Sequence, residues 1–384
     1  MRLIWKLLTS LGIVFFCLLI GFISVFLIYS PAPAIPVATV DFLGQATLPT
    51  GFSFQGTELG GLSGITYDPK QKVYYAITDD RSQKAPARFY KLKLDLTQGS
   101  LKDGGVVPVG VTTLLDETNQ PFAAGSLDPE GIAITSSGTV FISSEGDAKQ
   151  LIKPFIKEFS LSSGRQLKSL VVPSKFLPDA TRKRGIRNNL AFESLTITPD
   201  QKYLFTATES ALIQDGPDSA LGTSSPSRIL QYNLLTSQMQ REFLYLTEPV
   251  ASPLKFLGSF PNGLVDLLAL DNQGHLLSLE RSFIGLGYII RLFEVSLEGA
   301  DDIRDIDSLS AVDINTIKPV QKKLLLDFQT LNLPLDNIEG LTFGPQLADG
   351  RRSLIVVSDN NFQPAQRTQI LALGIRKVKS SKIN

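Results

Sequence analysis

Short runs of alternating apolar and polar residues recur along most of this chain, separated by turn-forming residues. One copy places a strand-like run at 192–197, a Pro199-Asp200 turn, and a second apolar run at 203–208. Alternation over four to eight residues on both sides of such a turn is typical of a β-hairpin. We therefore take this hairpin as the unit on which the chain is organised.

The hairpin pattern occurs five times, and each copy carries one position that opens its first strand and one that closes its second. Because hairpin strands are antiparallel, these two positions lie side by side at the open end. The opening positions hold Ser63, Glu130, Glu193, Asp266 and Glu339, and the closing positions hold Asp79, Glu145, Glu209, Glu280 and Asp359. Nine of these ten residues are acidic. Exposed strand ends carry Lys, Ser, Thr and Asn as readily as acids, so the uniformity favours a shared site over isolated turn acids.

The opening positions are separated by 67, 63, 73 and 73 residues, and each repeat has room for four strands. Further strands are expected at 87–95, 106–115, 154–161, 166–172, 228–234, 241–246, 288–297, 322–328 and 369–375. A repeat of four strands predicts an all-β propeller. The fifth repeat is one strand short, and 37–48 would complete it and close the ring, which removes exposed sheet edges. We predict five four-stranded blades; six remain an alternative because some repeats are long.

An uncharged apolar run at 7–29 follows Arg2 and Lys6. Its 23 residues are long enough to cross a bilayer as a helix, with the positive end in the cytoplasm and the propeller outside. A cleaved signal peptide is the competing interpretation, although its apolar core usually has about 7–15 residues. We favour the anchor, so membrane attachment and an extracytoplasmic location are expected.

The predicted organisation is an anchor or signal peptide at 1–30, a Pro/Ala-rich linker at 31–36, the propeller at 37–376 and a tail at 377–384. Cys17 is the only cysteine and lies in the apolar run, so the exported part has no disulfide or thiol chemistry. The chain has 37 acidic and 37 basic residues, a balance that gives no support to nucleic-acid binding. We expect a monomer.

Long connections at 173–189, 210–227 and 248–262 fall at the end of the hairpins that carries the acidic positions, while the opposite turns are short. Insertions gathered on one face of a repeat protein usually mark its binding face. Clustered carboxylates repel one another unless some are protonated or a cation lies among them. Oxygen ligands without His or Cys suit Ca²⁺ best and Mg²⁺ less well. The nine acids are therefore candidate metal ligands, for a catalytic ion or for one that only holds the blades together.

Basic residues follow several of these acids, and we take Arg81, Arg281 and Lys149 as candidates for binding an anionic substrate. Guanidinium groups suit phosphate and carboxylate, although salt bridges within the acidic rim are an equal alternative for both arginines. His275 is the only histidine, which excludes phosphohistidine chemistry, a two-histidine zinc site and most nucleophilic triads. An enzyme would need water polarised by a cation and carboxylates to move the proton, with Glu193 and Glu339 as the candidate catalytic pair.

The segments ELGGLSGITYD, SLDPEGIAI, FISSEGD, GIRNNLAFESLTITPD and NIEGLTF resemble the phytase-like family, described as having the esterase-like activity of phytase. The resemblance runs from about residue 59 to 375 and implies a β-propeller outside the cytoplasm that hydrolyses phosphate or other small-molecule esters with calcium. The first copy departs from the family pattern at Ser63, and the fourth has Asp266 without a following glycine. Propeller phytases have six blades, against the five counted here. A membrane-tethered binding module with structural calcium and a calcium-dependent lactonase remain alternatives.

Overall fold

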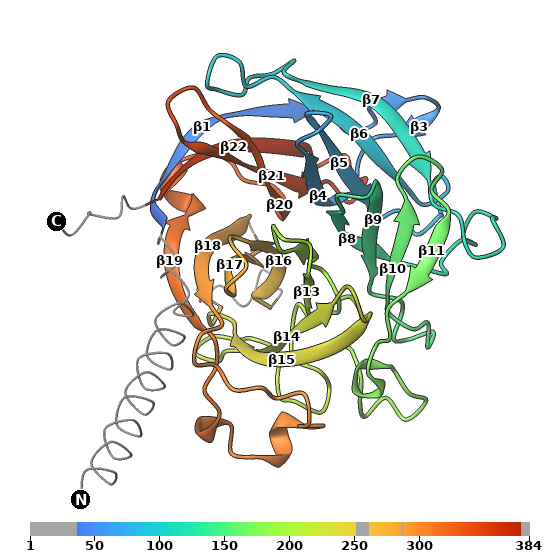
Figure 1. Cartoon of the computed structure of the whole chain (residues 1–384), viewed down its shortest axis with the longest axis vertical. Coiled ribbons are helices and arrows are strands. Elements are labelled where there is room, and N and C mark those ends of the chain that lie inside the picture. The colour runs from blue at the N-terminus through green and yellow to red at the C-terminus, as the bar shows by residue number, and fades with distance from the viewer. Residues whose placement is uncertain (1–36, 251–260, 286, 378–384) are drawn as a thin grey trace, which may run out of the picture. The chain divides into compact units, whose positions relative to one another are not determined.

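The computed structural model describes residues 37–250, 261–285 and 287–377 of the chain. Five four-stranded antiparallel sheets are arranged as blades around a central axis (Figure 1). In the described ranges, helical structure is limited to 3-10 turns, which are η1 (Ser174–Phe176), η3 (Leu309–Ala311), η4 (Ile314–Thr316) and η5 (Phe328–Leu331). The predicted all-β propeller with five blades is confirmed.

Each blade is built from strands that lie in chain order from the axis outward, except that the fifth blade takes its outer strand from the start of the chain. The first two blades are β4 (Leu62–Asp68), β5 (Val73–Thr78), β6 (Arg88–Leu94), β7 (Val106–Thr113), then β8 (Pro129–Ile134), β9 (Thr139–Ser144), β10 (Phe155–Ser160), β11 (Gln166–Ser169). The third and fourth are β12 (Thr196–Ile197), β13 (Tyr203–Ala207), β14 (Pro226–Asn233), β15 (Gln238–Leu246), then β16 (Gly263–Ala269), β17 (His275–Phe283), β18 (Tyr288–Ser296), β19 (Gln321–Asp327). The fifth is β20 (Asn337–Gln346), β21 (Arg352–Asp359), β22 (Thr368–Lys377) and β1 (Val37–Leu48), and a small hairpin of β2 (Ser53–Phe54) and β3 (Thr57–Glu58) follows β1.

The ring is closed by strands from the two ends of the described chain. Strand β1 pairs antiparallel with β22, with Val40 opposite Ile375 and Phe42 opposite Leu373. Figure 1 shows the blue β1 beside the red β22. The predicted closure is confirmed. It pairs β22, the third strand of the last blade, so that this edge is not left open.

Apolar side chains fill the spaces between neighbouring blades. Between the first and second blades, Tyr75 and Phe89 pack in one cluster with Ile132 and Phe159, and similar clusters lie at the other four junctions. A blade is therefore covered on both faces, which is why its middle strands read as nearly continuous apolar runs. Burial of these faces is the main force that holds the ring together.

Glycines allow the inner strands to approach closely around the axis. A Cβ atom at Gly64 would lie 2.5 Å from the carbonyl oxygen of Glu130, and one at Gly131 would lie 2.8 Å from that of Glu193. Neither distance is tolerable for a side chain, so the glycine after the opening position is needed for contact between adjacent blades. This requirement explains part of the SG and EG pattern in the sequence.

The connection from β18 to β19 runs along the outer edge of the third blade. The backbone N–H of Ile303 donates to the carbonyl oxygen of Glu242 at 2.8 Å, and that of Val320 donates to the carbonyl oxygen of Leu244 at 2.9 Å. This long segment covers the edge of β15 and protects it from pairing with another chain. Insertions are therefore not confined to the end that the sequence indicated.

In the described part of the chain, no helix is long and apolar enough to cross a membrane. The predicted anchor at 7–29 lies outside the described residues, together with Cys17, the linker at 31–36 and most of the predicted tail. The anchor therefore stays a prediction.

Candidate functional site

The open ends of the five hairpins meet at one end of the axis. In the first three blades, the backbone N–H of the closing residue donates to the carbonyl oxygen of the residue two positions before the opening one. The pairs are Asp79 with Gly61 at 2.8 Å, Glu145 with Asp128 at 3.0 Å and Glu209 with Ala191 at 2.7 Å. The same geometry in each blade brings the opening and closing side chains together.

A β-bulge turns the opening side chain away from the regular ladder. In the first blade, Leu62 pairs with Thr78 and Gly64 pairs with Ile77, so Ser63 between them has no partner on β5. The second and fifth blades have the same irregularity at Glu130 and Glu339. Bulges commonly redirect a side chain next to a functional site.

In the fourth blade, the predicted opening and closing positions, Asp266 and Glu280, are each wrong by one residue. Leu264 pairs with Glu280 and Asp266 pairs with Leu279, so the bulged residue is Val265. Gly263 pairs with Arg281, just as Asn337 pairs with Asp359 in the fifth blade. Val265 and Arg281 therefore occupy the opening and closing positions, and Asp266 and Glu280 do not.

Asp266 occupies the place that glycine takes in three other blades. Its carboxylate accepts hydrogen bonds from the backbone N–H groups of Leu267 at 2.8 Å and Leu341 at 2.7 Å. The second bond joins β16 to β20. Burial raises the pKa of Asp266 well above its usual value, and the hydrogen bonds oppose that rise. Its contacts are those of a structural carboxylate between two blades.

Glu280 lies between the third and fourth blades. Its carboxylate accepts hydrogen bonds from Tyr245 Oη at 2.7 Å and from Asn262 Nδ2 at 2.5 Å, and Lys322 Nζ lies 2.6 Å from Oε1. These partners satisfy its charge away from the axis. Glu280 is therefore a structural ion-pair residue.

The remaining predicted acids converge, and Asp128 joins them. We call this group the acidic end; its members are Asp79, Asp128, Glu130, Glu145, Glu193, Glu209, Glu339 and Asp359. Asp79 is half-buried and the other seven are buried. Each of the eight carboxyl groups raises the pKa of another member, has its own pKa raised by one, or both.

Burial is the largest cause of the raised pKa values at the acidic end, and neighbouring carboxylates add to it. The pKa of Glu130 lies well above its usual value because of burial and then because of Glu193 and Asp128. Burial raises the pKa of Asp128 to about 6 and that of Glu209 to about 7, even though an arginine lies beside each. Eight such groups cannot all be ionised near neutral pH without shared protons or a cation.

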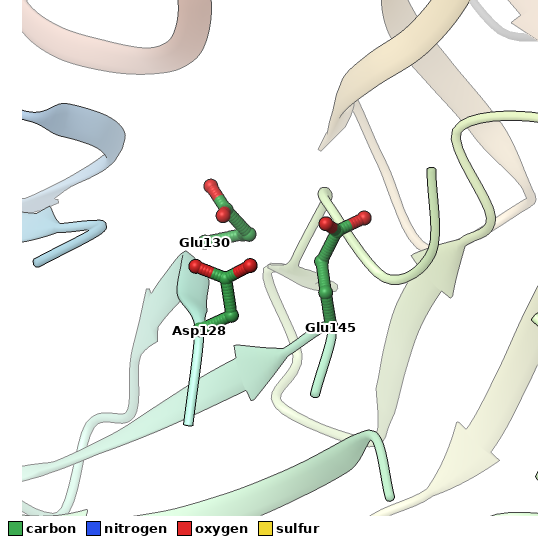
Figure 2. Close-up of side chains that lie close together, drawn as sticks. All are labelled: Asp128, Glu130 and Glu145. Atoms are coloured by element: carbon green, nitrogen blue, oxygen red, sulfur yellow. The ribbon is translucent and has the colours of Figure 1, made fainter. Parts of the chain in front are cut away.

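Asp128, Glu130 and Glu145 form the tightest part of the acidic end. One oxygen from each lies within 4.8 Å of the others. Figure 2 shows the three side chains close together, with Asp128 and Glu130 at the start of β8 and Glu145 just after β9. Asp128 was not among the predicted ligands, although it begins the DPEGI segment.

Some buried oxygens at the acidic end have no hydrogen-bond donor among the described residues, including Asp79 Oδ1 and Glu145 Oε2. Buried acceptors are normally satisfied, so these atoms call for a partner that the described residues do not supply. A divalent cation with a preference for oxygen ligands fits this set, and both Ca²⁺ and Mg²⁺ have that preference. The acidic end could therefore hold a metal ion.

Arg281 and Arg81 are the two predicted substrate-binding residues that contact the acidic end. Arg281 Nη2 lies 2.6 Å from Glu339 Oε1 and 3.7 Å from Glu209 Oε1, so the fourth blade supplies a cation where the others supply acids. Arg81 Nε donates to Asp128 Oδ1 at 2.7 Å from the rim. Lys149 is exposed, and within the described residues its ammonium group forms no ion pair.

Asn337 is a second residue that the sequence analysis missed. It stands two positions before Glu339, as Asp128 stands before Glu130, and its Nδ2 donates to Glu339 Oε1 at 2.8 Å. The equivalent glycines in the first and fourth blades, Gly61 and Gly263, leave room for carboxylates, because a Cβ atom there would clash with Asp79 and Glu209. A third aligned position, two residues before the opening one, holds a small or short polar residue in every blade. This pattern could have identified Asp128 and Asn337 from the sequence.

Residues 57–362 match the family described as "Phytase-like: Esterase-like activity of phytase". The chain belongs to the phytase-like family. An uncharacterized secreted protein of Arthroderma benhamiae is 29% identical over 132 residues, which cover 28% of this chain and 24% of that relative. The match thus spans about a quarter of the relative's length.

Solved structures with a similar fold have low sequence identity to this phytase-like chain. An endo-arabinase from Bacteroides thetaiotaomicron is 14% identical, with 88% of this chain and 99% of that chain covered and a TM-score of 0.42. A calcium-binding protein, regucalcin, from Agrobacterium tumefaciens is 12% identical, with 89% and 98% covered and a TM-score of 0.38. Neither likeness extends to chemistry.

Proposed function

We propose that the acidic end binds a divalent cation, with Ca²⁺ as the first candidate, and that this phytase-like propeller hydrolyses phosphate or other esters there. The observation that carries the proposal is the convergence of eight carboxylates beside Arg281, some with buried oxygens that lack donors among the described residues. Such a set costs folding free energy unless it serves a ligand. The substrate class follows from the family description.

Asp128, Glu130 and Glu145 are the residues proposed to hold the cation, because their oxygens are already close together. A bound cation would polarise the ester and a water molecule. Arg81 lies against Asp128 and would orient that carboxylate from the rim. The acids farther round the ring, Asp79 and Asp359, would complete the negative surroundings.

Glu193 is proposed to move the proton. Burial and the nearby carboxylates of Glu145 and Glu209 raise the pKa of Glu193 well above its usual value. A carboxyl group with a raised pKa can give and take a proton near neutral pH. The electrostatic influence of these two carboxylates on Glu193 places the three groups near one another, so a proton could be shared within the site.

Glu339 and Arg281 are proposed to position the substrate. Burial raises the pKa of Glu339, and Arg281 and Asn337, which both donate to its carboxylate, oppose that rise. Arg281 Nε is buried and has no acceptor among the described residues, so it keeps a donor for an anionic oxygen. A guanidinium group binds phosphate oxygens well, and this donor is fixed before the substrate arrives.

An extracytoplasmic location is part of the proposal. It is supported by the apolar run at 7–29, which follows basic residues, and by the secreted relative. Attachment to a membrane through that run is proposed on the same ground.

The test is a hydrolysis screen of the full chain with phosphomonoesters, phytate, carboxyl esters and lactones, in Ca²⁺ and in EDTA. We expect turnover of at least one ester in Ca²⁺, its loss in EDTA and its recovery when Ca²⁺ is restored. The double variant Glu130→Gln/Glu145→Gln should lose both Ca²⁺ binding and turnover. Glu298→Gln, the same change at an exposed site, should lose neither. Turnover that persists in EDTA would contradict the mechanism.

A binding module with a structural cation is the second candidate, and the depth of the ligands favours it. Glu145 and Glu209 are each only 1% exposed. An ion held there would join blades to one another without reaching bulk solvent. Cation-dependent stability together with no turnover on any ester would select this function.

A further inference from the structure

A pocket of about 500 Å³ lies at the opposite end of the axis from the acidic carboxylates. We call it the basal pocket. Its lining includes turn residues at the closed ends of the hairpins, such as Pro69, Ser136 and Pro199, and every blade contributes to it. The pocket wall reaches Ile132, which lies two residues after Glu130 on β8, so roughly 7 Å of strand at 3.3 Å per residue separates the wall from the acidic end. The turn after Asp68, at the far end of the pocket, lies roughly 20 Å from the start of β4.

The walls of the basal pocket are mostly apolar. Ile65, Ile132, Leu195 and Leu341 come from four different inner strands or their flanks, and Phe343 adds an aromatic ring. Hydroxyl and amide groups join them nearer the turns. The volume and this mixture are those of ordinary small-molecule sites, which measure about 300–1,000 Å³.

The charged groups of the basal pocket leave a positive excess. Asp68 is occupied by its own turn, because its Oδ1 accepts hydrogen bonds from the backbone N–H groups of Lys70 at 2.8 Å and Gln71 at 3.2 Å. Lys70 Nζ donates to the carbonyl oxygen of Ser136 at 2.8 Å. Two cations, Lys70 and Arg352, thus line the pocket with one carboxylate.

Arg352 is the group that lacks a counter-ion. Its guanidinium lies over the ring of Phe343, 3.5 Å from the centroid. Within the described residues no carboxylate forms an ion pair with it. Arg352 is exposed, and partial desolvation lowers its pKa. Stacking uses the face of the guanidinium plane and leaves its N–H donors at the edge free.

The neighbouring Arg351 provides a natural comparison. Its Nη2 lies 2.6 Å from Asp349 Oδ2, and its Nη1 lies 3.1 Å from Asp41 Oδ2. It is not part of the pocket lining. Two successive arginines therefore differ in that one is neutralised and the other is held at a cavity without an anion.

We propose that the basal pocket binds a small organic carboxylate whose apolar body lies against Ile65, Ile132, Leu341 and Phe343 and whose anionic group pairs with Arg352. The pocket is a second site, and it does not depend on the function proposed for the acidic end. The negative charge of the acidic end repels a carboxylate ligand, whereas Arg352 and Lys70 attract it to the basal pocket.

The test is isothermal titration of the full chain, in EDTA, with 2-naphthoate and with its uncharged analogue 2-naphthamide. We expect naphthoate to bind and naphthamide to bind roughly tenfold more weakly or worse, because a hydrogen bond to a charged group is lost. Arg352→Gln should weaken naphthoate binding by about tenfold and abolish the preference for the anion. Arg352→Lys should retain part of that preference, and Arg351→Gln should change neither ligand.

Three results would overturn the assignment. The first is no binding of naphthoate, and the second is an equal loss in the Arg351 and Arg352 variants. The third is competition by Ca²⁺, or loss of binding in Glu130→Gln/Glu145→Gln, because each would place the ligand at the acidic end. The titration needs neither turnover nor a metal, so its failure is distinct from failure of the proposed hydrolysis.

Discussion

The acidic end and the basal pocket are built from the same five inner strands, yet their chemistry is opposite. At the acidic end the hairpins open, and eight carboxylates surround Arg281. At the basal pocket the hairpins turn, and Arg352 has no carboxylate partner among the described residues. A propeller gives both ends five equivalent positions, so the residues that fill these positions decide the chemistry of each end.

The difference also concerns what each end lacks. Carboxylates at the acidic end have buried oxygens without donors, which calls for a cation or protons. At the basal pocket, Arg352 has no carboxylate partner among the described residues. The two ends should therefore respond in opposite ways to the loss of an arginine, to pH and to added ions, and these responses test the comparison.

The largest expected effect is that of replacing the arginine at each end. Arg281→Gln leaves Glu339 and Glu209 buried without their counter-charge, which should lower the free energy of unfolding by about 3–5 kcal/mol at neutral pH. Arg352→Gln breaks no ion pair among the described residues and should change it by less than about 0.5 kcal/mol. Urea unfolding of both variants measures the difference.

Acid should reduce the effect of Arg281→Gln, because protonated Glu339 and Glu209 no longer need a counter-charge. A similar loss of stability in both variants would show that Arg281 does not compensate the acidic end. So would an Arg281→Gln effect that stays constant from pH 5 to pH 7.5.

The second effect is the pH dependence of stability in EDTA. The folded-state pKa is about 6 for Asp128 and about 7 for Glu209, against ordinary values of 3.8 and 4.5. The folded state thus holds protons that the unfolded state releases, so the stabilisation is present below pH 4 and is lost as the pH rises through 6 to 7. The melting temperature should fall by several degrees over this range.

Calcium should reverse the trend at the upper end of that range, since it binds only the folded carboxylates and displaces their protons. Arg352→Gln should leave the pH profile unchanged, because Arg352 forms no ion pair with a carboxylate among the described residues. A melting temperature that rises with pH in EDTA would contradict the raised pKa values.

The third prediction distinguishes the metal-binding role proposed for the acidic end from the structural role of Asp266. Asp266→Asn replaces one acceptor oxygen by an NH₂ group that faces a backbone N–H, which should cost about 1–3 kcal/mol. It should nevertheless leave the rise of melting temperature with Ca²⁺ unchanged. Glu130→Gln/Glu145→Gln, at two of the proposed ligands, should reduce that rise by at least half. An equal response in both variants would restore Asp266 to the metal site.

The sequence predicted the blades well because each strand is encoded by its own apolar pattern. The closing strand was also predictable, since the fifth repeat was one strand short and 37–48 matched the missing one. The register of the fourth blade was not, because LVDLLAL and LERS offer an acid within one residue of each expected position. The choice between Val265 and Asp266 depends on a hydrogen bond to Leu341 in the next blade, which no local pattern encodes.

The different surroundings of Arg351 and Arg352 could not be predicted from the sequence either, because they depend on contacts with other parts of the fold. Arg351 and Arg352 are neighbours in the chain, and only the positions of Asp41, Asp349 and Phe343 in space distinguish them. The basal pocket is assembled from turns that share no residue type, so it left no repeated signal.

The smallest effect concerns the rim of the acidic end, where Arg81 and Lys149 were both expected to bind substrate. Arg81 contacts Asp128 through Nε and Nη2, with its side chain 30% exposed, whereas Lys149 contacts no acid in the described part of the chain. Arg81→Gln frees the oxygens of Asp128 and removes a nearby positive charge, so Ca²⁺ should bind roughly two- to fivefold more tightly. Lys149→Gln should leave the affinity unchanged, because solvent and salt screen its charge. Titration of both variants with Ca²⁺ measures these affinities. Weaker Ca²⁺ binding in Arg81→Gln would contradict the prediction and would show that Arg81 mainly orders Asp128 for the cation.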